Sequence, residues 1–180
     1  MTKVYEYDSS DKAAIAPLLR FGVAEIKGVG PFMIALNDAG LCWTGMTDSV
    51  DRLRKFFPDA VLLRDDKAVQ PLAREIAALW AGKVKKLPVP LVLAGSDFER
   101  AVWLRLLKIK KGSTVSYGDI ARDIGAPKAV RAVGTAVGKN PITLVVPCHR
   151  VLAQSKASQM KFGWGPKAKK ALLAAEGIQI

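Results

Sequence analysis

Two adjacent residues, Cys148 and His149, are the most reactive pair in the sequence. Cys148 is one of two cysteines, His149 is the only histidine, and both follow Pro147. A cysteine reacts as its thiolate, and a free thiol with a pKa of about 8.5 is ionised only to a few per cent at neutral pH. A nearby imidazole base, or a cation such as Arg150, would raise that fraction. Taken alone, the pair favours a buried and inert cysteine beside a chance histidine, because free cysteines are commonly buried.

The residues before this pair predict how it is held. Residues 142–146 are apolar or β-branched and precede Pro147, which predicts a short buried strand that stops at the proline. Neighbours in a strand point to opposite faces, so Cys148 and His149 could not bond to each other there. We expect the chain to turn after Pro147, where a water could bridge the thiol and the imidazole.

The composition indicates a globular protein inside the cell. At 180 residues, of which 50% are hydrophobic, the chain can bury a substantial core in one or two domains. Its apolar runs are far shorter than the roughly 20 residues that span a bilayer, and residues 1–8 carry charges where a signal peptide is apolar. We therefore expect it in the cytoplasm, or in the nucleus of a eukaryotic host. The cysteines and the histidine are too few for a disulfide framework or a usual zinc site, so we expect no metal.

The formal charge of +12 indicates a polyanionic partner. Lys and Arg number 28, against 16 Asp and Glu. An excess of this size is typical of proteins that bind nucleic acid or an acidic membrane surface. The alternative is that the charge only keeps the protein soluble. The position of the charges decides between these two interpretations.

Residues 1–88 are predicted to form an α+β domain. Two apolar segments around the turn-forming residues 37–40 are typical of a β-hairpin, and apolar residues at helical spacing follow. The pattern predicts, in order, a hairpin over 31–44, a helix from about 49 to 57 and a helix over about 69–80. This half contains no cluster of chemical groups, and Cys42 is expected in its core. The Gly-, Lys- and Pro-containing residues 82–88 are predicted to connect it to a second domain.

Residues 89–180 are predicted to form a second domain with a helix-turn-helix. Ser96 begins a capping box, which predicts a helix to about residue 108. Ser116 is a second N-cap, and Pro127 suits the first turn of a helix over 128–137. Two short helices joined by a tight glycine-containing turn are typical of a helix-turn-helix. Two helices packed as a simple corner would give the same pattern.

The second of these helices is predicted to bury one face and expose the other. Helical spacing places on the buried face Val130, Val133 and Val137, and on the exposed face Lys128, Arg131 and Thr135. The residues between them are small, Ala129 among them, so that a nucleic acid could approach the backbone closely. These features are typical of a recognition helix.

A last helix is predicted to pass through Leu172 and Leu173 and to stop at Gly177. Glu176 lies at its end, where a negative charge is unfavourable for the helix dipole. The carboxylate could therefore have a partner, and the only histidine, His149, is a candidate.

Several motifs of the C-terminal half together resemble one protein family. In order they are Val115-Ser116-Tyr117-Gly118, residues 127–134, Asn140-Pro141, Pro147-Cys148-His149-Arg150-Val151 and Leu172-Leu173 with Glu176-Gly177. In these motifs the chain resembles the methylated-DNA–protein-cysteine methyltransferases, also called O6-alkylguanine-DNA alkyltransferases. The N-terminal half fits only in length and α+β character. The implied fold is α+β: a small N-terminal α/β domain with an antiparallel sheet, then a C-terminal helical domain with a helix-turn-helix and an active-site strand.

The resemblance implies DNA repair by a protein that reacts once. Cys148 would take the alkyl group from O6 of a flipped guanine in duplex DNA, with O4 of thymine as a further substrate left open, and keep it as a thioether. His149 would act through a water as the base for Cys148, and Glu176 would orient the imidazole. Asn140 would fix the turn beside the active-site strand. Tyr117 would contact the base and help return a proton to the departing guanine.

The resemblance also implies which residues bind the DNA and the base. Arg131 would enter the space that the base leaves, with the helix in the minor groove. Further DNA contacts are expected from Lys128, Ala129, Thr135 and Ser116. The base pocket is expected to include Val151, Phe162, Gly163 and Trp164, with backbone groups of Cys148 and Val151 reading the base edge. The expected partner is double-stranded DNA containing O6-alkylguanine, bound by a monomer without cofactor, metal or membrane.

The sequence departs from the family at two places. The family commonly has a tyrosine near the position of Phe162, and phenylalanine can stack but cannot donate a hydrogen bond, so Gly163 is expected to supply an N–H. Residues 152–161 also lack the glycines expected there. Both departures concern the range of substrates. The N-terminal half lacks the cysteine and histidine set of the zinc-containing members and the cysteine-rich sensor domain of bifunctional regulators.

Three other functions fit part of the pattern. A DNA-binding protein that senses alkyl lesions without repairing them would lack the reactive cysteine, which is present here. A cysteine hydrolase using Cys148, His149 and Glu176 would not explain the charge or the helix that carries Arg131. A helix-turn-helix transcription regulator would read spaced half-sites in the major groove, and the helix over 128–137 is poor in base-reading side chains.

Overall fold

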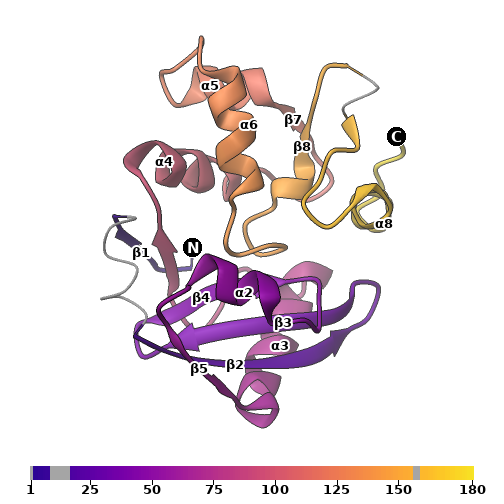
Figure 1. Cartoon of the computed structure of the whole chain (residues 1–180). Coiled ribbons are helices and arrows are strands. Elements are labelled where there is room, and N and C mark those ends of the chain that lie inside the picture. The colour runs from indigo at the N-terminus through magenta and orange to yellow at the C-terminus, as the bar shows by residue number, and fades with distance from the viewer. Residues whose placement is uncertain (1, 9–16, 156–158) are drawn as a thin grey trace. The chain divides into compact units, whose positions relative to one another are not determined.

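The computed structural model describes residues 2–8, 17–155 and 159–180 and divides the chain into two units (Figure 1). The first unit comprises Met1–Ser96 with Pro141–Val145, and the second comprises Asp97–Asn140 with Val146–Ile180. The division after Ser96 differs from the predicted boundary at residue 88. The reason is that Leu91–Ala94 is a strand of the first unit's sheet rather than the start of the second domain.

The first unit is built on a six-stranded mixed sheet in the order β1-β6-β4-β3-β2-β5. The strands are β1 (Val4–Tyr7), β2 (Leu18–Ile26), β3 (Gly30–Asn37), β4 (Gly40–Gly45), β5 (Val61–Arg64) and β6 (Leu91–Ala94). The expected antiparallel pairing holds only in the centre, where β2, β3 and β4 are joined by tight turns. The outer pairs β1–β6, β4–β6 and β2–β5 are parallel, because longer connections allow a strand to return in the same direction.

The predicted hairpin over 31–44 is confirmed by β3 and β4. Asn37 makes its turn, since its Oδ1 accepts hydrogen bonds from the backbone N–H groups of Ala39 and Gly40 at 2.9 and 3.0 Å. Gly40 begins β4 with φ of +146°, and a Cβ at this position would lie 2.3 Å from the carbonyl oxygen of Pro90. Glycine is therefore required where β4 passes the chain that leads into β6.

Among its described residues, the first unit also has the helices α2 (Asp51–Phe56) and α3 (Asp66–Ala81). Helix α3 begins three residues before its predicted start because Asp65 caps it, accepting a hydrogen bond from the N–H of Ala68 at 2.9 Å. It ends at Gly82, whose φ is +79°. The helix packs against β2 through a buried apolar face that includes Val69 and Ile76 (Figure 1).

The strand predicted over 142–146 is not formed as such. Pro141–Val145 instead contacts the end of β4, where the Thr44 N–H donates to the Pro141 carbonyl at 2.9 Å and the Thr44 hydroxyl donates to the Thr143 carbonyl at 2.7 Å. Leu144 has a φ of +74°, which breaks the extended conformation after a single bridge between Thr44 and Ile142. The apolar side chains of the segment are buried as predicted.

The second unit is mainly helical and contains two short parallel strands. Its elements within the described residues are α4 (Asp97–Leu106), β7 (Val115–Ser116), α5 (Tyr117–Asp123), α6 (Val130–Gly138), the 3₁₀ turn η2 (Cys148–Arg150), β8 (Val151–Leu152) and α8 (Pro166–Ala175). Helices α4, α5 and α6 pack together. Trp103 is buried at their centre, and its indole N–H donates to the Ala136 carbonyl at 2.8 Å. No helix within the described residues is long and apolar enough to cross a membrane.

The predicted helix-turn-helix corresponds to α5 and α6. The capping box at Ser116 is confirmed: its hydroxyl accepts from the Asp119 N–H, and the Asp119 carboxylate accepts from the Ser116 N–H. Helix α6 begins at Val130 rather than at Lys128, because Pro127 and Lys128 lie in a turn. Val130 is 41% exposed, so its predicted burial is wrong, whereas Val133 and Val137 are buried.

Replacing Gly40 by alanine is expected to destabilise the first unit. The added methyl group would overlap the Pro90 carbonyl and would require a φ that alanine disfavours, at a cost of about 1–3 kcal/mol. Gly138→Ala is the matched control, because no atom beyond its chain neighbours and the backbone of its own helix lies within 4 Å of the added methyl group, and its φ is not positive. Chemical denaturation should show loss of stability for Gly40→Ala and unchanged or slightly increased stability for Gly138→Ala. Equal stability of the two variants would contradict the requirement for glycine at residue 40.

Candidate active site

Cys148 begins the short 3₁₀ turn η2 directly after Pro147. The prediction that the chain turns after this proline is confirmed. Its N–H donates to the Val146 carbonyl at 2.8 Å. The Cys148 side chain is 6% exposed and His149 is fully buried. The turn therefore places a thiol and an imidazole together in a largely water-excluded part of the second unit.

Asn140 fixes the chain on the N-terminal side of Cys148. Its side-chain amide donates to the Val146 carbonyl at 2.8 Å. This hydrogen bond connects the chain just after α6 with the chain just before η2. Burial raises the pKa of the Cys148 thiol, and the hydrogen bond with Asn140 is the largest of the opposing effects. Asn140 thus both shapes this turn and favours the thiolate.

His149 is paired with Glu176, the partner that the sequence indicated. Its Nε2 lies 3.1 Å from Oε1 of Glu176, and both side chains are completely buried. Burial lowers the pKa of His149, although the Glu176 carboxylate acts in the opposite direction. The imidazole is therefore neutral at neutral pH. Since its Nε2 faces a carboxylate, we assign the proton to Nε2, which makes Nδ1 the basic nitrogen.

Arg150 and Gly112 also bind Glu176, and sequence reasoning did not find these contacts. The Arg150 guanidinium donates to the two carboxylate oxygens at 2.8 and 3.0 Å, and the Gly112 N–H donates at 3.1 Å. Arg150 also donates to the Ile109 carbonyl at 2.7 Å. Burial alone would raise the pKa of Glu176, but the hydrogen bonds from His149 and Arg150 outweigh it and lower the pKa to about 2.

Tyr117 is the first residue of α5 and is partly buried. Burial raises the pKa of its hydroxyl, and the negative charge of a Cys148 thiolate raises it further. The second effect indicates that the hydroxyl and the thiol are close enough to interact electrostatically. The Tyr117 hydroxyl is therefore protonated at neutral pH.

Lys169 is a buried charged residue that the sequence analysis missed. Its side chain is 1% exposed, and its Nζ donates to the carbonyls of Val151, Gln159 and Lys161 at 2.7, 2.8 and 3.3 Å. A signal was present in the sequence, because Lys169 lies three and four residues before Leu172 and Leu173 and so falls on the buried face of α8. Burial lowers its pKa to about 8.

The predicted DNA-binding residues lie at and around α6. Arg131 and Thr135 are exposed on α6, and Lys128 is exposed in the turn before it rather than on the helix. Ala129 is the N-cap residue of α6 and is half-buried. The Ser116 hydroxyl takes part in the capping box of α5, so any contact that it makes with DNA competes with Asp119.

The predicted base-pocket residues come from two segments. Val151 is buried in β8, directly after the turn η2, and pairs with Val115 of β7. Phe162, Gly163 and Trp164 form a turn in which the Gly165 N–H donates to the Phe162 carbonyl at 3.0 Å. Phe162 and Trp164 are half-buried and Gly163 is exposed. Residues 156–158 of the preceding loop lie outside the described residues.

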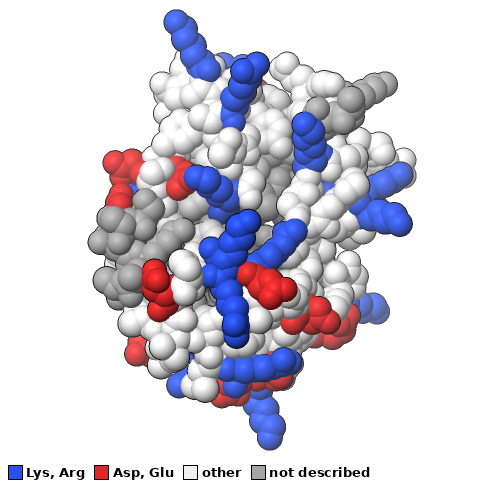
Figure 2. Space-filling model, viewed as in Figure 1, with Lys and Arg blue, Asp and Glu red and all other residues white. Residues whose placement is uncertain are grey.

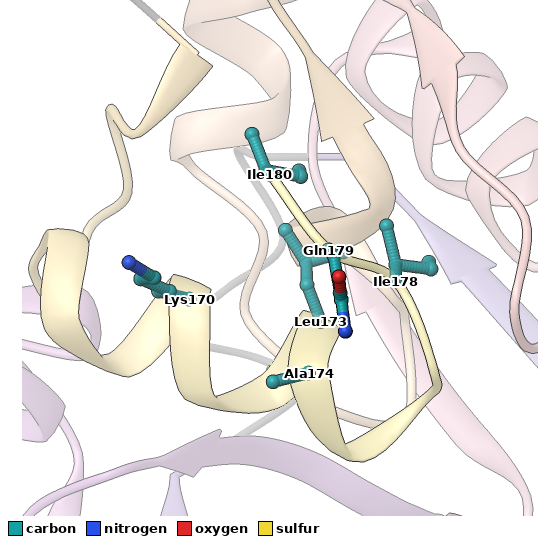
Figure 3. A pocket seen from close by; sticks show the side chains of 6 residues that line it. All are labelled: Lys170, Leu173, Ala174, Ile178, Gln179 and Ile180. Atoms are coloured by element: carbon teal, nitrogen blue, oxygen red, sulfur yellow. The ribbon is translucent and has the colours of Figure 1, made fainter.

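A pocket at the end of α8 contains none of the predicted site residues (Figure 3). Its lining is formed by Lys170, Leu173, Ala174, Ile178, Gln179 and Ile180. Within the described part of the chain, no three His, Cys, Asp or Glu side chains are grouped so that they could hold a metal ion.

The positive charge is concentrated in the unit that contains Cys148. The second unit has 15 Lys and Arg against 5 Asp and Glu, which accounts for +10 of the total of +12. On the face shown in Figure 2, most of the acidic side chains lie on the first unit, where they are mixed with basic ones. This distribution favours an anionic partner for the second unit over a general effect on solubility.

Comparison with known proteins identifies the family. The family described as "6-O-methylguanine DNA methyltransferase, DNA binding domain" matches residues 97–178. The inducible methylated-DNA–protein-cysteine methyltransferase of Bacillus subtilis is 44% identical over 69% of this chain and 72% of its own length. A methylated-DNA–protein-cysteine methyltransferase of Methanosarcina acetivorans is 34% identical over 83% of this chain and 93% of its own length.

A solved structure supports the same relationship for both units. The crystal structure of Mycobacterium tuberculosis OGT in complex with DNA has a TM-score of 0.72 and 36% identity, and the match covers 87% of this chain and 92% of that protein. The resemblance inferred from the motifs is therefore confirmed, and the α+β fold class with it. The chain belongs to the methylated-DNA–protein-cysteine methyltransferase family.

Proposed function

We propose that this protein repairs duplex DNA by moving an alkyl group from O6 of guanine to Sγ of Cys148, once per molecule. The observation that carries the proposal is the chain of contacts around Cys148: Asn140 holds the turn before it, and a buried, ionised Glu176 orients the neighbouring His149. A nucleophile, a base and a group that orients the base are the parts that activate a thiol.

The first step is formation of the thiolate. The Cys148 proton passes through a water to Nδ1 of His149, since the residues are neighbours in a tight turn and Nε2 faces Glu176. The resulting imidazolium is stabilised by the Glu176 carboxylate. Because burial opposes both the thiolate and the imidazolium, the hydrogen bond from Asn140 and the charge of Glu176 are needed to form the pair.

The second step is the transfer itself. The thiolate attacks the alkyl carbon, a C–S bond forms, the C–O6 bond breaks, and its electron pair goes to the guanine. The proton that His149 took from Cys148 returns to the departing guanine through Tyr117, whose raised pKa keeps its hydroxyl protonated, and the imidazole is neutral again. The product thioether is inert to water at neutral pH, so the protein is not regenerated.

DNA binding is assigned to the second unit. Its charge favours sequence-independent contact with phosphates, and α6 exposes Arg131 beside small residues that allow a close approach. The target base must leave the helical stack to meet a thiol that is 6% exposed, and Arg131 fills the space that it leaves. The M. tuberculosis relative crystallised with DNA supports this assignment. Such a substrate places the protein in the compartment that holds the chromosome.

The base pocket is assigned to Val151, Phe162, Gly163 and Trp164. Phe162 supplies a stacking surface without a hydrogen-bond donor, and the Gly163 N–H is the donor proposed for O6. A pocket that reads O6 through one backbone N–H also accepts O4 of thymine in principle, so O4-alkylthymine is the second substrate to test.

Incubation with an oligonucleotide containing O6-methylguanine is expected to add one methyl group to each protein molecule. Intact-protein mass spectrometry should show the gain, and peptide mapping should place it on Cys148. Cys148→Ala should show no gain. Cys42→Ala is the matched control and should react like the wild type, because burial raises the pKa of Cys42 to about 12 and keeps it a thiol. No gain by the wild type, with DNA binding retained, would instead identify a protein that senses lesions without repairing them.

Arg131→Ala is expected to slow transfer from duplex DNA at least tenfold, because it removes the side chain proposed to replace the flipped base. Transfer from the free base O6-benzylguanine should change little, since no base is flipped. Arg74→Ala, which removes the same charge from an exposed position of α3 in the first unit, is the control. Single-turnover rates measure the effect. An equal loss of transfer rate on both substrates would show that Arg131 does not act in base flipping.

Glu176→Gln is expected to reduce both transfer and stability, and the stability loss should depend on pH. The folded-state pKa of Glu176 is lowered from 4.5 to about 2, so its charge stabilises the fold above about pH 4.5 and this contribution is lost as the pH falls towards 2. Removing one partner of a buried ion pair costs about 3–5 kcal/mol at neutral pH. Urea denaturation of both proteins between pH 7 and pH 3 should show a difference that narrows with acid. A difference independent of pH would contradict the lowered pKa.

A further inference from the structure

Lys169 is the one lysine or arginine among the described residues that is buried, at 1% exposure. A lysine is almost never fully buried unless its charge is compensated. Its compensation here is unusual, because the acceptors are backbone carbonyl oxygens. An ammonium group has three N–H donors, and the three carbonyls use all of them.

The three carbonyls belong to two segments, one at the start and one at the end of residues 151–161. Val151 begins β8 and directly follows the reactive turn η2. Gln159 and Lys161 come just before Phe162. One ammonium group on α8 therefore connects the chain that leaves Cys148 with the chain that enters the turn of Phe162 and Gly163.

A purely structural role would be filled more cheaply by an apolar side chain. Position 169 lies on the buried face of α8 with Leu172 and Leu173, where leucine or methionine would pack without desolvating a charge. Burial raises the pKa of the Cys148 thiol and lowers the pKa of Lys169, and the opposite charges of the thiolate and the ammonium act against both shifts. The positive charge of Lys169 therefore favours the thiolate form of Cys148.

We propose that Lys169 is a positioning residue for alkyl transfer: through its bonds to Val151, Gln159 and Lys161 it holds the Phe162–Gly163 side of the base pocket in register with Cys148, and its charge stabilises the thiolate. This inference rests on the proposed function, because it assigns the turn at 162–163 to the base pocket. Lys169 does not touch the reacting atoms.

The variant that tests the proposal is Lys169→Met, which keeps the length of the side chain and removes its donors and charge. Lys170→Met is the matched control, because Lys170 is the next residue of α8, is exposed, and borders the pocket at the end of the helix (Figure 3). Three quantities are compared with the wild type: affinity for unmodified duplex DNA, the single-turnover rate of methyl transfer from O6-methylguanine DNA, and the pH dependence of Cys148 alkylation by iodoacetamide.

Lys169→Met is expected to bind DNA as the wild type does, to transfer at least tenfold more slowly, and to react with iodoacetamide at a higher midpoint pH. Lys170→Met should match the wild type in all three. Wild-type rate and an unchanged midpoint in folded Lys169→Met would overturn the proposal and leave Lys169 a structural residue.

Two further measurements keep the test decisive. If Lys169→Met does not fold, the ¹⁵N resonance of Lys169 Nζ is titrated in the wild type before and after Cys148 is blocked with iodoacetamide. A pKa well below 10.5 that changes on blocking supports the proposal, and an ordinary pKa overturns it. If the wild type itself accepts no methyl group, the proposed function fails, while the iodoacetamide profiles still decide whether Lys169 acts on Cys148.

Discussion

The buried carboxylate of Glu176 is the interaction on which the arrangement around Cys148 depends. It lies at the C-terminal end of α8, where the helix dipole opposes a negative charge, and in a place without solvent. Donors from His149, Arg150 and Gly112 compensate for both effects. Because Arg150 also binds the Ile109 carbonyl, one ionised group fixes α8, the reactive turn and the chain between α4 and β7 relative to one another.

The reactive turn needs such external support because it is short. A 3₁₀ turn of three residues has few hydrogen bonds of its own. Asn140 binds the Val146 carbonyl before Cys148, and Lys169 binds the Val151 carbonyl after it. The turn is thus held at both ends by side chains from other elements, so its geometry does not depend on the local conformational preference of Cys148, His149 and Arg150.

The sequence predicted the features that depend on neighbouring residues. The hairpin at Asn37 and the capping box at Ser116 are set by contacts within three residues, and the structure confirms both. It did not predict the exposure of Val130, the φ of Leu144 or the contacts of Arg150, because these are set by residues distant in the chain. The pairing of His149 with Glu176 could be predicted because the chain has one histidine and because a carboxylate at the C-terminal end of a helix needs a compensating partner. The burial of Lys169 was not predicted, because a lysine is rarely buried and the carbonyls that compensate its charge belong to other segments of the chain.

Burial suits the single reaction proposed for this site. It raises the pKa of Cys148 and lowers that of His149, so the resting pair is a neutral thiol and a neutral imidazole, and few stray electrophiles reach the thiol. An enzyme that turns over would gain from a permanently ionised nucleophile, but a protein consumed by each reaction loses a molecule to every side reaction. Under the proposed mechanism the Glu176 carboxylate stabilises the imidazolium and the Lys169 ammonium stabilises the thiolate when the pair forms. Burial thus protects the resting thiol, and the buried charges of Glu176 and Lys169 help to activate it.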